Sequence, residues 1–190
     1  MARDFDCTLH ILPEACVVAA AILLLIPLQW ALAWIAAAIC HELFHCLALV
    51  LCRKDIQEVV IGANGAEIRT GMLSNKESIV CTLAGPVGGF LLLLVLDTFP
   101  RLAICGFLQS LFNLIPIYPM DGGRALRGLI DLVLSERTAG MLCNIVEILF
   151  LVLIFLLGLF LTVFLKLGLS PVLIAVFFAI HIKKIKRPCK

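Results

Sequence analysis

The stretch HELFH at residues 41–45 lies inside an apolar run that extends over residues 28–52. A helix of that length spans about 37 Å, which is enough to cross a bilayer with some tilt. On a helix that advances about 100° per residue, His41 and His45 lie about 40° apart and Glu42 falls on the adjoining side. Charged groups are rare inside a membrane span without a functional reason. The run therefore predicts a membrane helix that carries a chemical site.

Two neutral imidazoles one helical turn apart can bind a zinc ion together. Glu42 lies too far round the helix to join them, but it can reach a water molecule on the metal, whose pKa zinc lowers to about 7. The five-residue pattern alone also fits a membrane helix that uses the same residues for packing or ion transport. A third ligand is needed to decide between these interpretations.

The composition predicts an integral membrane protein. The chain has 190 residues, of which 63% are hydrophobic, and its mean hydropathy is +1.14. Such values lie far outside the range of soluble globular proteins, and the length fits one domain, residues 1–190. The formal net charge is only +2, so we expect no nucleic-acid partner. The nine cysteines form no C-x-x-C pair, and we interpret them as small apolar packing residues.

The apolar runs predict an all-α polytopic membrane protein with about six transmembrane helices. The expected spans are residues 11–26, 28–52, 78–96, 102–117, 139–165 and 169–182. The first follows a head that contains Asp4 and Asp6, which is a poor start for a cleaved signal peptide, so we interpret it as a retained anchor. Between the second and third spans, two short strand-like runs flank Asn64-Gly65 and predict a β-hairpin.

Residues 116–123 interrupt the helical pattern after the fourth span. Two prolines and two glycines surround Asp121, and we expect that they cannot continue as regular helix. Irregular backbone at membrane depth is tolerated only where it is buried in protein or lines a water-filled cavity. Residues 124–137 then have the apolar spacing of an amphipathic helix at the membrane interface.

The basic residues set the expected orientation. With six spans and both termini on one face, thirteen Lys and Arg residues lie on that face and only Arg101 and Lys166 on the other. Positive residues accumulate on the cytoplasmic side, so both termini are predicted to be cytoplasmic. His45 then lies about 10 Å along its helix from the cytoplasmic end.

The same orientation brings residues 116–123 to the cytoplasmic side. Asp121 is therefore the natural third ligand, because a catalytic zinc takes three protein ligands and keeps a fourth position for water. His10 and His181 are weaker candidates, since each lies near the end of a span, where interfacial solvation accounts for a histidine.

Residues 41–45 together with NLIPIYPMDGG at residues 113–123 resemble the site-2 protease family. Within it, the compact layout resembles the bacterial sporulation-stage-IV processing proteases, and the similarity covers about residues 28–125. The family consists of intramembrane zinc metalloproteases. The resemblance implies His41, His45 and Asp121 as ligands of Zn²⁺ and Glu42 as the general base.

The resemblance also carries weaker implications. Asn113, Pro116 and Pro119 would shape the substrate cleft, and residues 62–71 would correspond to a membrane-dipping loop. The chain departs from the family at Gly88, where the family commonly has Asn shortly after its Ala-Gly-Pro. Glu147, deep in the fifth span, matches no motif, and packing and cavity lining are equally open to it.

The expected function is an intramembrane zinc endopeptidase in the bacterial cell membrane. The substrate would be a membrane-associated protein such as a pro-sigma factor or an anti-sigma factor, and the partners would be the lipid bilayer and an inhibitory or regulatory membrane protein. The alternative is a zinc-binding transporter, for which Glu42→Gln should spare function. An inactive scaffold is a third possibility, which the intact set of His41, Glu42, His45 and Asp121 disfavours.

Overall fold

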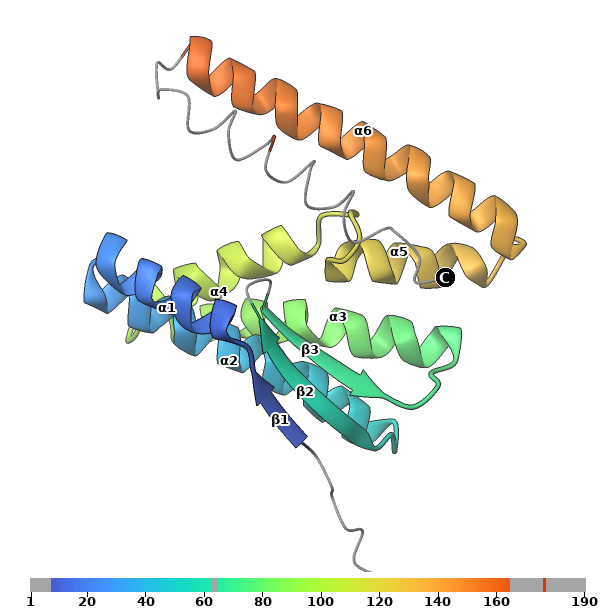
Figure 1. Cartoon of the computed structure of the whole chain (residues 1–190), viewed down its shortest axis with the longest axis horizontal. Coiled ribbons are helices and arrows are strands. Elements are labelled where there is room, and N and C mark those ends of the chain that lie inside the picture. Colours follow the sequence, from blue (N-terminus) through green and yellow to red (C-terminus); the bar gives the residue numbers. More distant parts are fainter. Residues whose placement is uncertain (1–7, 63–64, 165–175, 177–190) are drawn as a thin grey trace, which may run out of the picture. The chain divides into compact units, whose positions relative to one another are not determined.

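The computed structural model describes residues 8–62, 65–164 and 176. The chain divides into two compact units, Met1–Asn113 and Leu114–Lys190. The first unit contains the elements β1 (Thr8–Ile11), α1 (Pro13–Leu25), α2 (Leu28–Leu51), β2 (Ile56–Gly62), β3 (Gly65–Thr70), α3 (Asn75–Leu91), the 3₁₀ turn η1 (Leu92–Val95) and α4 (Pro100–Asn113). The second contains α5 (Asp121–Asp131) and α6 (Glu136–Val163) (Figure 1). The expectation of a single domain over residues 1–190 stays a prediction.

The described helices confirm a mainly helical, polytopic membrane fold. Three segments are long and apolar enough to cross a membrane, namely α2, α3 with η1, and α6. Helix α1 has only 13 residues and α4 only 14, so the first and fourth predicted spans are shorter than expected. The sixth predicted span, residues 169–182, and His181 lie outside the described residues.

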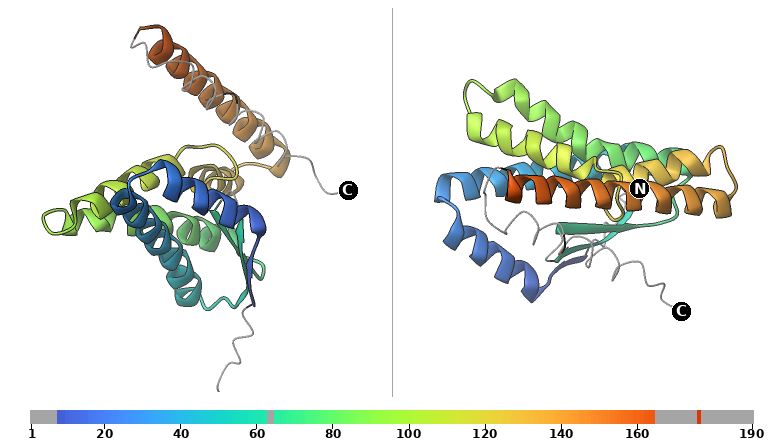
Figure 2. Two further views of the ribbon diagram at one scale, coloured as in Figure 1. Left: turned by 60° about the vertical axis from the view of Figure 1, so that its left-hand side comes forward. Right: turned by 90° about the horizontal axis from the view of Figure 1, so that it is seen from above.

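Helices α2, α3 and α4 lie side by side and pack through small residues (Figure 2). A Cβ atom at Gly89 would overlap the Ser110 hydroxyl and lie 2.8 Å from the Gly106 carbonyl oxygen. The Gln109 side-chain amide adds a polar contact, because its Nε2 donates to the Trp34 carbonyl at 2.9 Å. Helices that approach this closely place residues of one within reach of the backbone of the next.

The predicted hairpin forms, and a third strand joins it. Strands β2 and β3 pair antiparallel and end at the Gly62–Gly65 pair, where Gly65 has a φ of 107°. Strand β1 pairs parallel with β2, with Thr8 opposite Glu58 and Ile11 opposite Ile61. A four-residue strand carries almost no periodic signal, so the sequence did not predict it.

The backbone between α4 and α5 differs from the expectation at two points. Helix α4 ends at Asn113, not at residue 117, because Pro116 lacks an N–H group and keeps the preceding residue out of the helical conformation. The glycine pair, expected to break the helix, instead forms the first turn of α5, which begins at Asp121. The predicted amphipathic segment at residues 124–137 therefore starts earlier and ends at Asp131.

Candidate metal centre

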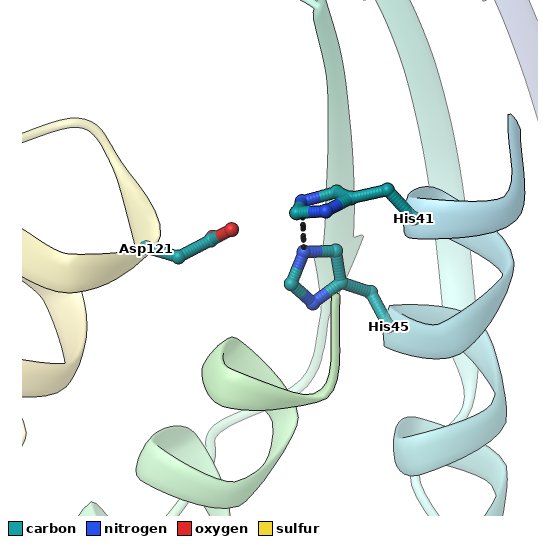
Figure 3. A group of neighbouring side chains, drawn as sticks. All are labelled: His41, His45 and Asp121. Atoms are coloured by element: carbon teal, nitrogen blue, oxygen red, sulfur yellow. Dashed lines mark hydrogen bonds between the residues drawn. The ribbon is translucent and has the colours of Figure 1, made fainter. Parts of the chain in front are cut away.

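His41 and His45 face one another on successive turns of α2 (Figure 3). Their Nε2 atoms lie 3.1 Å apart, and the ring planes are inclined by 81°. His41 is buried and His45 is half-buried. The i, i+4 spacing in the sequence therefore places the two imidazoles on one face of the helix with their Nε2 atoms adjacent, as the helical periodicity predicts.

The backbone of α3 orients the His45 ring. The Nδ1 atom of His45 lies 2.7 Å from the carbonyl oxygen of Cys81. A carbonyl oxygen only accepts hydrogen bonds, so Nδ1 carries the proton and Nε2 of the neutral imidazole keeps its lone pair. Metal-binding histidines are commonly held this way, with the second ring nitrogen donating to a carbonyl or carboxylate.

Gly85 brings the backbone of α3 close to the two imidazoles. A Cβ atom at this position would overlap Nε2 of His45 and lie 2.7 Å from Nε2 of His41. Only glycine can bring the α3 backbone past the two nitrogens at this distance. Two imidazole nitrogens this close together, with no side chain of α3 against them, fit a metal ion. Gly85 belongs to the Ala-Gly-Pro step of the sequence, and the structure places it at the histidines.

Asn113, the last residue of α4, lies next to the histidine pair. Its Nδ2 atom lies 3.5 Å from Nε2 of His41. Asn113 and the two histidines thus come together within the first unit, although 72 residues separate Asn113 from His41. The predicted substrate-binding role of Asn113 stays a prediction.

The other residues that the sequence predicts for the site lie on α2, on α5, in the segment before α5 and on β1. Glu42 follows His41 on α2 and is half-buried. Asp121 is the first residue of α5 and is buried, while Pro116 and Pro119 lie in the irregular segment before it. His41, His45 and Asp121 are a donor set of the kind that can hold a metal ion. His10, a weaker candidate, lies on β1, exposed, with its Nε2 3.7 Å from a carboxylate oxygen of Glu58.

The packing around Gly88 leaves no room for the Asn that site-2 proteases commonly have near this position. A Cβ atom there would overlap the Phe44 ring and lie 2.9 Å from the Phe44 Cβ. Phe44 is the fourth residue of the HELFH stretch and points from α2 towards α3. The space that an asparagine side chain would need is therefore filled by this ring.

Comparison with solved structures finds a site-2 protease from Methanocaldococcus jannaschii. The two structures superpose with a TM-score of 0.67 at 17% sequence identity, and the match covers 100% of this chain and 95% of that one. No family model matches the sequence, and no curated protein matches it. At this level of identity the likeness establishes the fold. The narrower resemblance to sporulation-stage proteases stays a prediction.

Proposed function

We propose that this chain is an intramembrane zinc endopeptidase of the site-2 protease type, which hydrolyses a peptide bond within or beside a membrane segment of its substrate. The observation that carries the proposal is the histidine pair: two Nε2 atoms lie 3.1 Å apart, the Cys81 carbonyl orients one ring, and Gly85 places no side chain against the two nitrogens. The site-2 protease fold supports it.

His41, His45 and Asp121 would hold the zinc ion. Three protein ligands with a fourth position left open are the pattern of catalytic zinc sites, whereas structural sites use four. A bound zinc ion acts as a Lewis acid that polarises the scissile carbonyl and activates water. The donor set of two imidazoles and one carboxylate suits Zn²⁺.

The chain's own groups would carry the proton and hold the substrate. The Glu42 carboxylate takes the proton of the attacking water and passes it to the leaving amine, which is general acid–base catalysis. A helical substrate hides its carbonyls in backbone hydrogen bonds, so it must unwind before cleavage. Asn113, Pro116 and Pro119 would hold the unwound segment extended.

The substrate class and location follow from the sequence resemblance. We propose a membrane-tethered transcription regulator or pro-sigma factor as substrate, an inhibitory or regulatory membrane protein as partner, and the bacterial cell membrane as location. The three helices that are long and apolar enough to span a bilayer support a membrane location.

Substitution of Glu42 by Gln tests the proposed chemistry. The amide cannot take a proton from water, so cleavage of a panel of single-span substrates by the purified protein in detergent should fall by about 10²- to 10⁴-fold. Bound zinc, measured on the same samples, should stay at the wild-type level because Glu42 is no ligand. Glu67→Gln, which removes an exposed carboxylate on β3, is the matched control and should cleave normally.

Two results would overturn this mechanism. Undiminished cleavage by Glu42→Gln would exclude Glu42 as the general base. Zinc binding by both proteins with no cleavage of any substrate, together with zinc flux into vesicles that Glu42→Gln does not reduce, would instead establish the zinc-binding transporter.

A further inference from the structure

Helix α6 carries a buried carboxyl group that the proposed chemistry does not use. Glu147 has an exposed fraction of only 6%, although it lies within a helix that is long and apolar enough to span a membrane. The other acidic residue of this helix, Glu136, is exposed in its first turn. Burial of a carboxyl group within a membrane span costs free energy unless other groups bond to it, so the contacts of Glu147 indicate its role.

Glu147 accepts a hydrogen bond from the backbone of the segment between α4 and α5. Its Oε1 atom lies 3.2 Å from the Tyr118 nitrogen, which donates. The other N–H groups of residues 116–120 bond locally: Ile117 N–H donates to the Ile115 carbonyl at 2.7 Å and Met120 N–H to the Ile117 carbonyl at 2.9 Å. The two prolines have no N–H group. The Glu147 contact therefore completes the backbone hydrogen bonding of this segment.

Helix α5 packs against the same peptide group. A Cβ atom at Gly123 would lie 2.5 Å from both the carbonyl carbon of Ile117 and the nitrogen of Tyr118. Ile117 itself is fully buried. The Ile117–Tyr118 peptide is thus in close contact with the first turn of α5 through Gly123 and hydrogen-bonded to α6 through Glu147. Asp121 lies in that first turn, three residues after Tyr118.

We propose that Glu147 is a positioning residue for Asp121. By holding the Ile117–Tyr118 peptide, its carboxyl group fixes the backbone from which α5 starts and so the direction of the Asp121 side chain. The inference rests on the proposed function for the ligand role of Asp121. The hydrogen bond to Tyr118 stands independently of that role.

The test compares Glu147→Gln with Glu147→Leu. The Gln side chain keeps an oxygen that can accept the Tyr118 N–H, whereas Leu has a similar size and no acceptor. Hydrogen exchange, followed by mass spectrometry on peptides that cover residues 115–121, should be about tenfold faster in Glu147→Leu and unchanged in Glu147→Gln. Zinc affinity, measured by competition with a chelator, should fall about tenfold or more in Glu147→Leu only. Glu136→Leu, on the same helix, should change neither.

The outcomes separate this inference from the proposed function. Rapid exchange at Tyr118 in the wild-type protein would overturn the inference without need of a folded Leu variant. Equal exchange in all variants would overturn it as well. Faster exchange with unchanged zinc affinity would overturn the positioning of Asp121. Failure of the proposed ligand set would appear elsewhere, as unchanged zinc affinity in Asp121→Ala. Unchanged exchange in peptides from the last turns of α6 shows that the second unit of Glu147→Leu has kept its fold.

Discussion

At the scale of single residues, the site depends on which nitrogen of each imidazole is available. The Cys81 carbonyl holds Nδ1 of His45 at 2.7 Å and so leaves Nε2 for a metal. Gly85 keeps the α3 side chains away from this nitrogen, because any Cβ at this position would overlap it. The HELFH stretch cannot supply these two contacts by itself, because Cys81 and Gly85 both belong to α3.

Replacement of Gly85 by Ala should weaken metal binding without lowering the helix propensity of α3. The added methyl group would overlap Nε2 of His45 and crowd Nε2 of His41, so we expect zinc affinity to fall by tenfold or more. Ala is also a better helix former than Gly by about 0.5–1 kcal/mol, which excludes poor helix formation as the cause. Chelator competition measures the affinity. Gly71→Ala, where nothing lies within 4 Å of the new Cβ, is the control and should bind zinc normally; equal affinity in both variants would contradict the role of Gly85.

The substitution Gly88→Asn, which introduces the residue that site-2 proteases commonly have near this position, should destabilise the first unit. The new side chain would overlap the Phe44 ring, and overpacking of this kind costs about 1–3 kcal/mol. Thermal unfolding in detergent should show a lower Tm. The double variant Gly88→Asn with Phe44→Ala should recover part of the loss; a double variant no more stable than the additive expectation would show that Phe44 is not the obstacle.

At the scale of elements, α3 begins with a capping box. The Ser74 side chain accepts from the Glu77 N–H at 3.4 Å, and the Glu77 carboxylate accepts from the Ser74 N–H at 2.8 Å. Lys54 adds an ion pair to Glu77 at 3.0 Å, which joins the start of α3 to the loop after α2. These contacts position the helix that supplies Cys81 and Gly85.

Loss of the cap should weaken this arrangement. Ser74→Ala removes the hydroxyl acceptor at the N-cap, for which we expect about 1 kcal/mol of lost stability. A denaturant or thermal titration in detergent measures the change. Ser78→Ala, one turn further along the same helix, serves as the comparison, and a larger loss there than at Ser74 would contradict the capping role.

At the scale of the whole molecule, orientation in the membrane stays a prediction. The thirteen-to-two distribution of basic residues predicts cytoplasmic termini. Single cysteines at two exposed positions, Met72 before α3 and Asp97 after η1, would then lie on opposite sides of the membrane.

Thiol labelling can measure this orientation. In a variant whose native cysteines are replaced, Asp97→Cys should react with a membrane-impermeant reagent in intact cells, and Met72→Cys should react only after permeabilisation. The reverse pattern would place the termini outside and would put the proposed site on the other side of the membrane.

Local patterns in the sequence determined the elements that depend on local physics. The apolar run at residues 28–52 became α2, the Asn-Gly step marked the β2–β3 hairpin, and the i, i+4 spacing placed His41 and His45 on one face. Each depends on hydrophobic periodicity or turn chemistry, which neighbouring residues determine.

The tertiary structure alone decided the contacts between segments far apart in the chain. It paired β1 with β2, set Gly85 and the Cys81 carbonyl against the histidines, and gave the Glu147 carboxyl the N–H of Tyr118. These contacts join atoms that are 29 or more residues apart in the sequence. Periodicity shows which face of a helix is apolar, but close packing of whole elements decides which atoms meet across that face.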